Sequence, residues 1–152
     1  MAFSLENVVP WGRNLDEYTR MFALSESDLQ GSILGCGDGP ASFNAELTAQ
    51  GAQVTSLDPL YGFERAAIAQ RIEETFDTVI TQTEQNVDTF VWDTLGSVEQ
   101  LATLRRRTMT TFLEDYVRGK EQRRYLEGSL PTLPFSNQTF NLALCSHFLF
   151  LL

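Results

Sequence analysis

Three glycines and one acid carry the clearest chemical signal in this sequence of 152 residues. Gly35, Gly37 and Gly39 alternate along one short segment. Glycines allow a sharp backbone turn and let a ligand come into contact with the main chain. Asp58 follows 23 residues after the first glycine, where an acid can accept two hydrogen bonds from the hydroxyls of a ribose. The pattern therefore predicts a site for a nucleoside-containing ligand.

Spacing separates the classes of ligand that use such a turn. The dinucleotide fingerprint reads G-x-G-x-x-G, and here Pro40 occupies the position of its third glycine. The glycines read G-x-G-x-G instead, which disfavours an NAD(P)-binding Rossmann protein but leaves it as an alternative. No G-x-x-x-x-G-K-[ST] segment occurs in the sequence, so a phosphate loop of that type is excluded.

The residues around the turn predict the elements that hold it. In chain order we expect a short strand at 32–34, the glycine turn, a helix from Pro40 to about Gln50, and a strand at 53–57. Proline is preset for the first position of a helix, and Gly51 suits a left-handed helix cap. Strand, turn, helix and strand form a βαβ unit, whose crossover is right-handed in nearly all proteins.

The segment after the second strand is much longer than a simple crossover, which needs about a dozen residues. Apolar side chains recur at helical spacing over 66–82, and Ser97 opens a further helix in the capping-box pattern. We therefore expect a helical insertion over 61–122 that acts as a lid over the sheet. A shorter helical segment is expected over 1–30.

Strand-like sequence returns after this insertion. Residues 124–127 read as a short strand, and the nearly continuous apolar run at 140–145 is typical of a strand buried on both faces. The sequence therefore predicts an α/β fold, a Rossmann-like parallel sheet of four strands with flanking helices and the long insertion between the second and third strands. We expect a single domain over 1–152.

Composition and charge exclude several classes of protein. Apolar residues make up 43% of the chain, enough for a packed core, and the net charge of −9 disfavours a general nucleic-acid binder. Cys36, Cys145 and a single histidine make neither a disulfide framework nor a zinc site, so we expect no metal. The sequence shows no signal-peptide pattern and no apolar stretch long enough for a bilayer. The expectation is a cytoplasmic protein without membrane contact.

Two segments of the chain resemble the class I S-adenosylmethionine-dependent methyltransferases. Residues 33–39, Ile-Leu-Gly-Cys-Gly-Asp-Gly, and the later Asp58 are similar to the first two motifs of that family. Residues 133–145 look like its loop and fourth strand, usually written LPF-x-x-x-x-FD-x-V. The resemblance covers roughly residues 31–60 and 124–150. It implies an enzyme that takes a methyl group from S-adenosylmethionine as cofactor.

The resemblance also implies where the cofactor binds. The glycine turn would line the methionine part, the acid after the second strand would hold the ribose, and the next two residues would flank the adenine. The loop after the third strand would touch the adenine edge, and the end of the fourth strand would lie beside the transferable methyl. The implied contacts are, in chain order, Gly35, Cys36, Gly37, Gly39, Asp58, Pro59, Leu60, Ser129, Leu130, Cys145 and Ser146.

Three further residues are candidates for the site. His147, the only histidine, matches the place where the family sometimes holds an acceptor-side base, and histidine can serve as a base near neutral pH. A polar residue at the start of the next helix fits this position equally well. Arg13 and Tyr18 fit residues that close over the cofactor from the N-terminal segment, and equally well ordinary surface residues.

The leading hypothesis is methyl transfer to an unidentified acceptor, a small molecule rather than a nucleic acid. The alternative is an inactive truncated fragment or binding module, since family members often carry acids where this chain has Ile33, Ser129 and Asn141. The family's sheet has seven strands, so a four-stranded chain is expected to be an incomplete domain. If the chain ends at Leu152, the open edge of its last strand and the apolar tail at 148–152 predict self-association.

Overall fold

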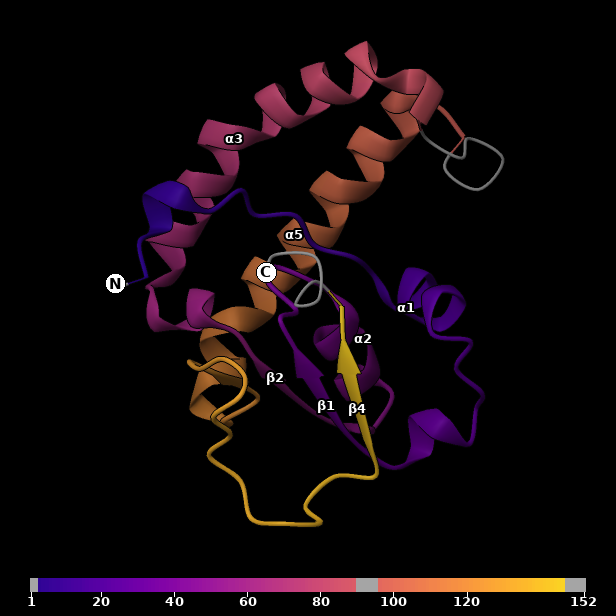
Figure 1. Ribbon diagram of the computed structural model, residues 1–152, viewed down its shortest axis with the longest axis vertical. Helices are drawn as coiled ribbons and strands as arrows, with labels where there is room; N and C mark the ends of the chain where they lie inside the picture. The colour runs from indigo at the N-terminus through magenta and orange to yellow at the C-terminus, as the bar shows by residue number, and fades with distance from the viewer. Residues whose placement is uncertain (1–2, 90–95, 147–152) are drawn as a thin grey trace.

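The computed structural model describes residues 3–89 and 96–146 (Figure 1). Its helices and strands, in chain order, are α1 (Leu15–Met21), β1 (Ser32–Cys36), α2 (Phe43–Ala49), β2 (Gln53–Leu57), α3 (Arg65–Gln85), α5 (Val98–Glu121), β3 (Tyr125–Leu126) and β4 (Leu142–Cys145). Short 3₁₀ helices lie at Leu5–Asn7 (η1), Asp28–Gln30 (η2), Pro59–Gly62 (η3) and Val87–Thr89 (η4).

The described strands run parallel in one sheet in the order β3-β2-β1-β4. β1 pairs with β2 over its whole length, from Ser32 opposite Gln53 to Cys36 opposite Leu57. On its other side β1 pairs with β4, and the last residues of these two strands, Cys36 and Cys145, lie opposite each other. The predicted α/β Rossmann-like sheet of four strands, with a helical insertion between the second and third, is therefore confirmed.

Alternate side chains of the strands face α1 and α2. One buried cluster joins three strands to these helices, and its members are Tyr18, Ile33, Ala41, Phe43, Leu47, Val54 and Leu144. The rings of Tyr18 and Phe43 stack with their centroids 4.4 Å apart. This packing holds α1 and α2 against the sheet and so fixes the segment that joins β1 to α2.

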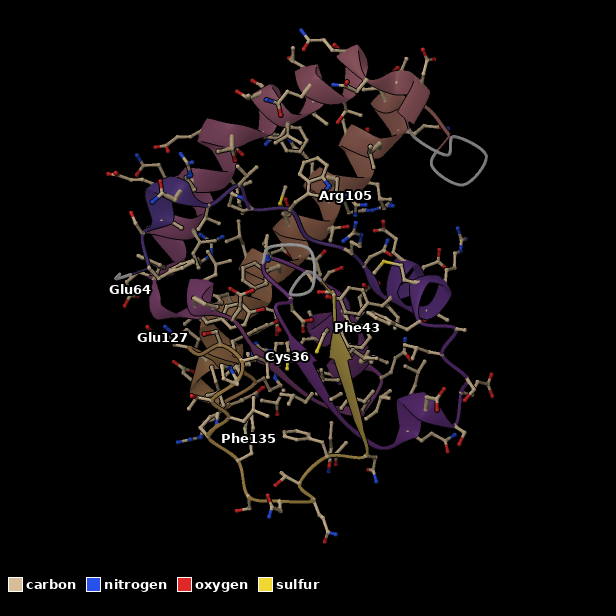
Figure 2. All side chains as sticks on the ribbon, viewed as in Figure 1. Cys36, Phe43, Glu64, Arg105, Glu127 and Phe135 are labelled. Atoms are coloured by element: carbon tan, nitrogen blue, oxygen red, sulfur yellow. The ribbon has the colours of Figure 1, made fainter. Side chains whose placement is uncertain are left out.

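The other face of the sheet is covered by a loop in the described part of the chain. Leu34, Cys36 and Leu57 point to this face, and the apolar side chains that pack against them are Leu126, Leu130, Phe135, Phe140 and Cys145. Most of these come from the segment between β3 and β4, and Figure 2 shows Phe135 close to the sheet.

The prediction that the last strand is buried on both faces is wrong. Leu144 is buried in the cluster with α1 and α2, but Ala143, on the opposite face, is exposed. β4 lies at the edge of the described sheet, and the loop that covers Leu34 does not cover Ala143.

The prediction that the second helix starts at Pro40 is also wrong, because α2 begins at Phe43. The amides just before it bond to other parts of the chain instead of to a helical turn. Gly39 N donates to Asp58 Oδ2 (2.9 Å), and Ser42 N donates to the carbonyl of Arg13 (3.1 Å). The turn is therefore longer than the proline suggests, and it is held by contacts to distant segments.

The insertion forms an arm of two long helices. α3 and α5 extend from the sheet and approach each other at their far ends (Figure 1). A buried cluster at the base joins the arm to η3 and β3, and its members are Leu60, Tyr61, Ile68, Ile72, Phe76, Met109, Phe112, Tyr116 and Tyr125. The predicted cap of α5 is present, since Ser97 Oγ accepts from Gln100 N (3.2 Å). None of the described helices is both long and apolar enough to span a membrane.

Candidate functional site

The glycine turn lies at the carboxyl ends of β1 and β2, the edge where open α/β sheets bind ligands. Gly37 and Gly39 have φ angles of 74° and 57°, which residues with side chains rarely adopt. Gly37 N donates to the carbonyl of Leu57 (2.8 Å), which ties the turn to the end of β2. A Cβ added at Gly35 would lie 2.0 Å from Asp38 Oδ2, so this position has no room for a side chain.

Asp58 reaches back to the same turn, where the sequence predicted a ribose-binding acid. Its Oδ2 accepts from Gly39 N (2.9 Å), and its Oδ1 accepts from Leu60 N (2.8 Å). Burial raises the pKa of Asp58, and the two amide donors act in the opposite direction. Each carboxylate oxygen can accept a second hydrogen bond, so the group retains capacity for the hydroxyls of a ligand.

Asp38 is a second acid at the turn, and the sequence had not singled it out. Its side chain is only 2% exposed and points under the turn. Tyr18 Oη donates to its Oδ1 (2.8 Å), and Ser56 Oγ donates to its Oδ2 (2.6 Å). Burial raises the pKa of Asp38 to about 6, although both hydroxyl donors lower it. An acid between two glycines was the available signal, but its partners lie about twenty residues away on either side.

The end of β4 joins this network. Ser146 Oγ donates to the carbonyl of Gly37 (3.0 Å) and lies 3.2 Å from Tyr18 Oη. Tyr18 therefore links α1 to both the turn and the end of β4. The structure brings together the predicted methionine-end residues of the turn and of β4. Tyr18, the candidate from the N-terminal segment, is 1% exposed and lies in the same network, so it is not an ordinary surface residue.

The two cysteines of the candidate site are neighbours on adjacent strands. Both are free thiols, Cys36 buried and Cys145 partly buried. Burial and the nearby thiol of Cys145 raise the pKa of Cys36 to about 12. A buried thiol with a raised pKa is a poor nucleophile. Cys36 is therefore suited to line the site and not to react with a ligand.

The candidate adenine-side residues follow β2 and β3, whose ends are adjacent in the sheet. Pro59 begins η3, and the side chain of Leu60 is buried in the core beneath the arm. Ser129 is exposed, whereas Leu130 packs on the loop-covered face with Leu57. These positions therefore differ in what they can offer a ligand: Leu60 contributes its amide to Asp58, and Ser129 is open to solvent.

His147, the candidate acceptor-side base, lies outside the described residues, as does the apolar tail at 148–152. In the described ranges, no three histidine, cysteine or acidic side chains gather as metal ligands would.

The charge at the turn is negative. Asp38 and Asp58 are close enough for the charge of Asp58 to raise the pKa of Asp38. Within residues 3–89 and 96–146, no lysine or arginine forms an ion pair with either carboxylate. One buried and one partly buried carboxylate without a cationic partner in this part of the chain favour a ligand that brings positive charge.

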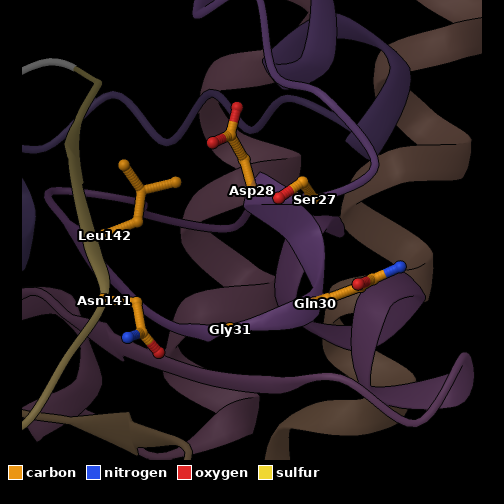
Figure 3. A pocket seen from close by; sticks show the side chains of 6 residues that line it. All are labelled: Ser27, Asp28, Gln30, Gly31, Asn141 and Leu142. Atoms are coloured by element: carbon orange, nitrogen blue, oxygen red, sulfur yellow. The ribbon is translucent and has the colours of Figure 1, made fainter.

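Two surface depressions lie at the opposite, amino edge of the sheet. One, of about 400 Å³, is shown in Figure 3 and is lined by Ser27, Asp28, Gln30, Gly31, Asn141 and Leu142. The other, of about 490 Å³, lies where β1 and β2 begin, beside Phe135 and Phe140. In the first depression, Asn141 Oδ1 accepts a hydrogen bond from Ser32 N (2.8 Å). Because parallel sheets bind ligands at the carboxyl edge, neither depression replaces the glycine turn as the candidate site.

Comparison with known proteins adds one similarity. The chain is 32% identical over 149 residues to the uncharacterized protein MJ0045 of Methanocaldococcus jannaschii. The match covers 97% of this chain and 66% of that protein, so the chain spans just under two thirds of that protein's length. No family model matches the sequence, and no solved structure gives a significant match.

Proposed function

We propose that the protein is an S-adenosylmethionine-dependent methyltransferase. The observation that carries this proposal is a pair of carboxylates, the buried Asp38 and the partly buried Asp58, at a glycine turn on the carboxyl edge of a parallel sheet. A sulfonium and an ammonium group would supply the positive charge that this turn favours. The ribose of the same molecule would supply hydroxyls for Asp58.

The same charge argument disfavours a dinucleotide. A pyrophosphate would add two negative charges beside Asp38 and Asp58, and like charges repel strongly where water is excluded. Dinucleotide sites instead bind pyrophosphate through a longer glycine fingerprint at a helix N-terminus. Here Gly39 N donates to the carboxylate of Asp58, and Ser42 N donates to the main-chain carbonyl of Arg13. Two of the amides before α2 therefore already have acceptors.

The residues of the chain fit the group that the proposal requires. Gly37 and Gly39 keep the main chain bare at the turn, and a Cβ added at Gly39 would meet only Asp58 Oδ2 at 4.0 Å. Cys36 and Cys145 supply small side chains at the methyl end. S-adenosylmethionine, when bound, supplies a methyl group on a sulfonium that already activates it for displacement. The protein's work is then to orient the acceptor and to exclude water.

The acceptor is proposed to be a small molecule, because the net charge of −9 repels polyphosphate. The arm of α3 and α5 is the proposed lid and acceptor-selecting element, since its base packs directly on η3 beside Asp58. A cytoplasmic location is part of the same proposal, supported by the free thiols Cys36 and Cys145.

Thermal unfolding of the purified protein with different ligands tests the proposal. S-adenosylmethionine and S-adenosylhomocysteine should each raise the unfolding temperature, because a ligand that binds only the folded state stabilises it. NAD at the same concentration should leave that temperature unchanged. Stabilisation by NAD alone would assign the turn to a dinucleotide and overturn the proposal.

A further inference from the structure

A chain of hydrogen bonds reaches the glycine turn from the side of α5. Arg124, just before β3, forms an ion pair with Asp115 on α5 (2.7 Å), and its Nη1 donates to Asn44 Oδ1 (2.8 Å). Asn44 Nδ2 donates to Ser56 Oγ (3.0 Å), which in turn donates to Asp38 Oδ2 (2.6 Å). Asn44, Ser56 and Asp38 are all buried. The chain therefore connects α5 to Asp38 beneath the turn, away from bulk water.

The direction of each bond in this chain follows from Arg124. Arginine can only donate, so it fixes the amide of Asn44 with the oxygen toward the guanidinium. The amide nitrogen then faces Ser56 Oγ and the carbonyls of Val54 (3.3 Å) and Arg124 (3.1 Å). Because Ser56 Oγ accepts from Asn44, its single proton goes to Asp38 Oδ2. Oδ2 is thus an acceptor in either charge state of Asp38, and a proton taken up by this acid must lie on Oδ1.

The other carboxylate oxygen, Oδ1, faces a hydroxyl with two acceptors. Tyr18 Oη lies 2.8 Å from Asp38 Oδ1 and 3.2 Å from Ser146 Oγ, and Ser146 Oγ donates to the carbonyl of Gly37 (3.0 Å). The hydroxyl of Tyr18 has one proton, so it donates to one of these acceptors at a time. When Asp38 is ionised, Tyr18 donates to it. When Asp38 is protonated, it donates to Tyr18, and Tyr18 donates to Ser146.

Both charge states of Asp38 are therefore provided with hydrogen bonds. The ionised form accepts from Tyr18 and Ser56, and the neutral form completes an unbroken chain from Arg124 to the carbonyl of Gly37. A buried acid whose surroundings stay hydrogen-bonded can change its charge without a large structural cost. Burial raises the pKa of Asp38 to about 6, so both forms exist near neutral pH.

The groups around Asp38 leave it as the one whose charge responds to the methyl end of a ligand. The titratable and charged groups that act on it, directly or through Tyr18 and Asn44, are Arg13, Tyr18, Cys36, Asp58, Tyr61 and Arg124. Burial raises the pKa of Cys36 to about 12 and that of both tyrosines well above the usual range, so these groups stay neutral. Both arginines stay charged near neutral pH. Burial also raises the pKa of Asp58, but its proposed partner is the ribose.

The proposed cofactor and its spent product differ by one positive charge at the methyl end. S-adenosylmethionine carries a sulfonium where S-adenosylhomocysteine carries a neutral thioether, and the rest of the two molecules is the same. The end of β4, where Ser146 lies, is the predicted place beside the transferable methyl, and Tyr18 links Ser146 to Asp38 Oδ1. A positive charge at this place favours the ionised form of Asp38. The ionised form in turn favours the cationic ligand.

We propose that Asp38 selects the ligand by its charge: the sulfonium of S-adenosylmethionine displaces a proton from Asp38 Oδ1 to bulk water, and the thioether of S-adenosylhomocysteine leaves that proton in place. The inference rests on the proposed function. It makes Asp38 the residue that distinguishes the cofactor from its product. When methyl transfer removes the positive charge, Asp38 can take up a proton again, and the preference for the cation is lost.

Calorimetric titration with both ligands over a range of pH tests this inference. The quantity to follow is the affinity for S-adenosylmethionine divided by the affinity for S-adenosylhomocysteine. In the wild type this ratio should rise by about five- to tenfold from about pH 5 to about pH 7.5, because displacement of one proton changes affinity by up to tenfold per pH unit below a pKa of about 6. The ratio cancels groups that act on both ligands alike, such as Asp58.

Variants assign the effect to this carboxyl. Asp38→Asn copies the neutral form, because its amide NH₂ can donate to Tyr18 while its oxygen accepts from Ser56. Its ratio should not change with pH and should stay near the low-pH value of the wild type. Ser56→Ala removes a donor that stabilises the ionised form, so the rise should move to higher pH. Asp77→Asn, an exposed acid on α3, is the control and should follow the wild-type profile.

Proton release by the wild type gives a test that needs no variant. Titrations near pH 6 in buffers of different ionisation enthalpy should show that S-adenosylmethionine releases about half a proton more per chain than S-adenosylhomocysteine does. Equal proton release, a wild-type ratio that does not change with pH, or a wild-type rise retained in Asp38→Asn would each overturn the inference, while binding of both ligands upholds the proposed function. Failure of the folded wild type to bind either ligand would contradict the proposed function and this inference with it.

Discussion

At the scale of single residues, the site is defined by acids whose environments differ from those of surface carboxylates. Asp58 accepts two main-chain amides and faces the glycine turn, whereas Asp38 is enclosed by the hydroxyls of Tyr18 and Ser56. Burial raises the pKa of both groups. Their roles differ accordingly: Asp58 keeps capacity for a ligand, and Asp38 shapes the turn from beneath and adds negative charge.

Asp58→Ala should weaken binding of S-adenosylhomocysteine by about 1.5–3 kcal/mol, because hydrogen bonds to a charged group are lost. Calorimetric titration gives this value directly. Asp58→Asn provides a nearly isosteric variant that keeps one acceptor oxygen, enough for the amide of either Gly39 or Leu60 but not both. Asp77→Asn, an exposed acid on α3, is the matched control and should bind as the parent does. If Asp58→Ala bound S-adenosylhomocysteine as tightly as the parent protein does, Asp58 would not be the acid that binds the ribose.

Asp38 should make the folding stability depend on pH. Its pKa in the folded protein is about 6, above the ordinary value of 3.8, so the folded state holds the proton more tightly than the unfolded chain. Stability from this group is therefore largest below about pH 4 and falls as the pH rises through about 6. Relative to Asp38→Asn, the unfolding free energy of the wild type should decline by up to about 3 kcal/mol between pH 4 and 7.

Denaturant unfolding of the two proteins at several pH values measures that decline. The comparison with Asp38→Asn cancels the other titrating groups, among them Asp28 and Asp115, whose lowered pKa values give the opposite slope. A difference between the proteins that does not change with pH would show that Asp38 titrates normally.

At the scale of elements, α1 and the residues just before it are joined to α5 through Arg105. The ion pair of Arg105 with Glu17 is largely buried, and Arg105 also donates to the carbonyl of Gly12. An exposed pair, Arg106 with Glu73, joins α5 to α3 one residue further along. The two neighbouring pairs therefore offer a matched comparison of a buried and a solvated ion pair.

Glu17→Gln should cost about 3–5 kcal/mol of stability, because it leaves the buried charge of Arg105 without its partner. Glu73→Gln should cost less than about 1 kcal/mol, because water solvates both members of that pair. Chemical denaturation of each variant measures the two costs. Equal costs would mean that the buried pair does not fasten α1 to α5 as described.

The elements also show what local sequence determines. Glycines and prolines at the ends of elements predicted the βαβ unit. Helical spacing and the cap at Ser97 predicted the helical insertion that follows it. The prediction that α2 starts at Pro40 was wrong because Ser42 N donates to the main-chain carbonyl of Arg13, a distant partner that no local pattern reveals. Asp38 was missed for the same reason, since Tyr18 and Ser56 come to it only in the folded chain. Arg13 was noticed, but its attachment to the turn depends on α5 and α2.

At the scale of the whole molecule, helices cover one face of the sheet and a loop covers part of the other. β4 forms one edge of the described sheet, Ala143 is exposed, and the strand holds no lysine or proline to block pairing with another strand. Self-association of the 152-residue chain stays a prediction. Sedimentation at micromolar concentration should show it, and Ala143→Lys should reduce it. A monomer in that measurement would contradict the prediction.

The most direct measurement of the central claim is calorimetric titration of the folded protein with S-adenosylhomocysteine and, separately, with NAD. The carboxylates of Asp38 and Asp58 at a G-x-G-x-G turn predict saturable binding of S-adenosylhomocysteine at one site per chain and no measurable binding of NAD. Tighter binding of NAD, or binding of neither ligand by a protein shown to be folded, would contradict the assignment of this turn to S-adenosylmethionine.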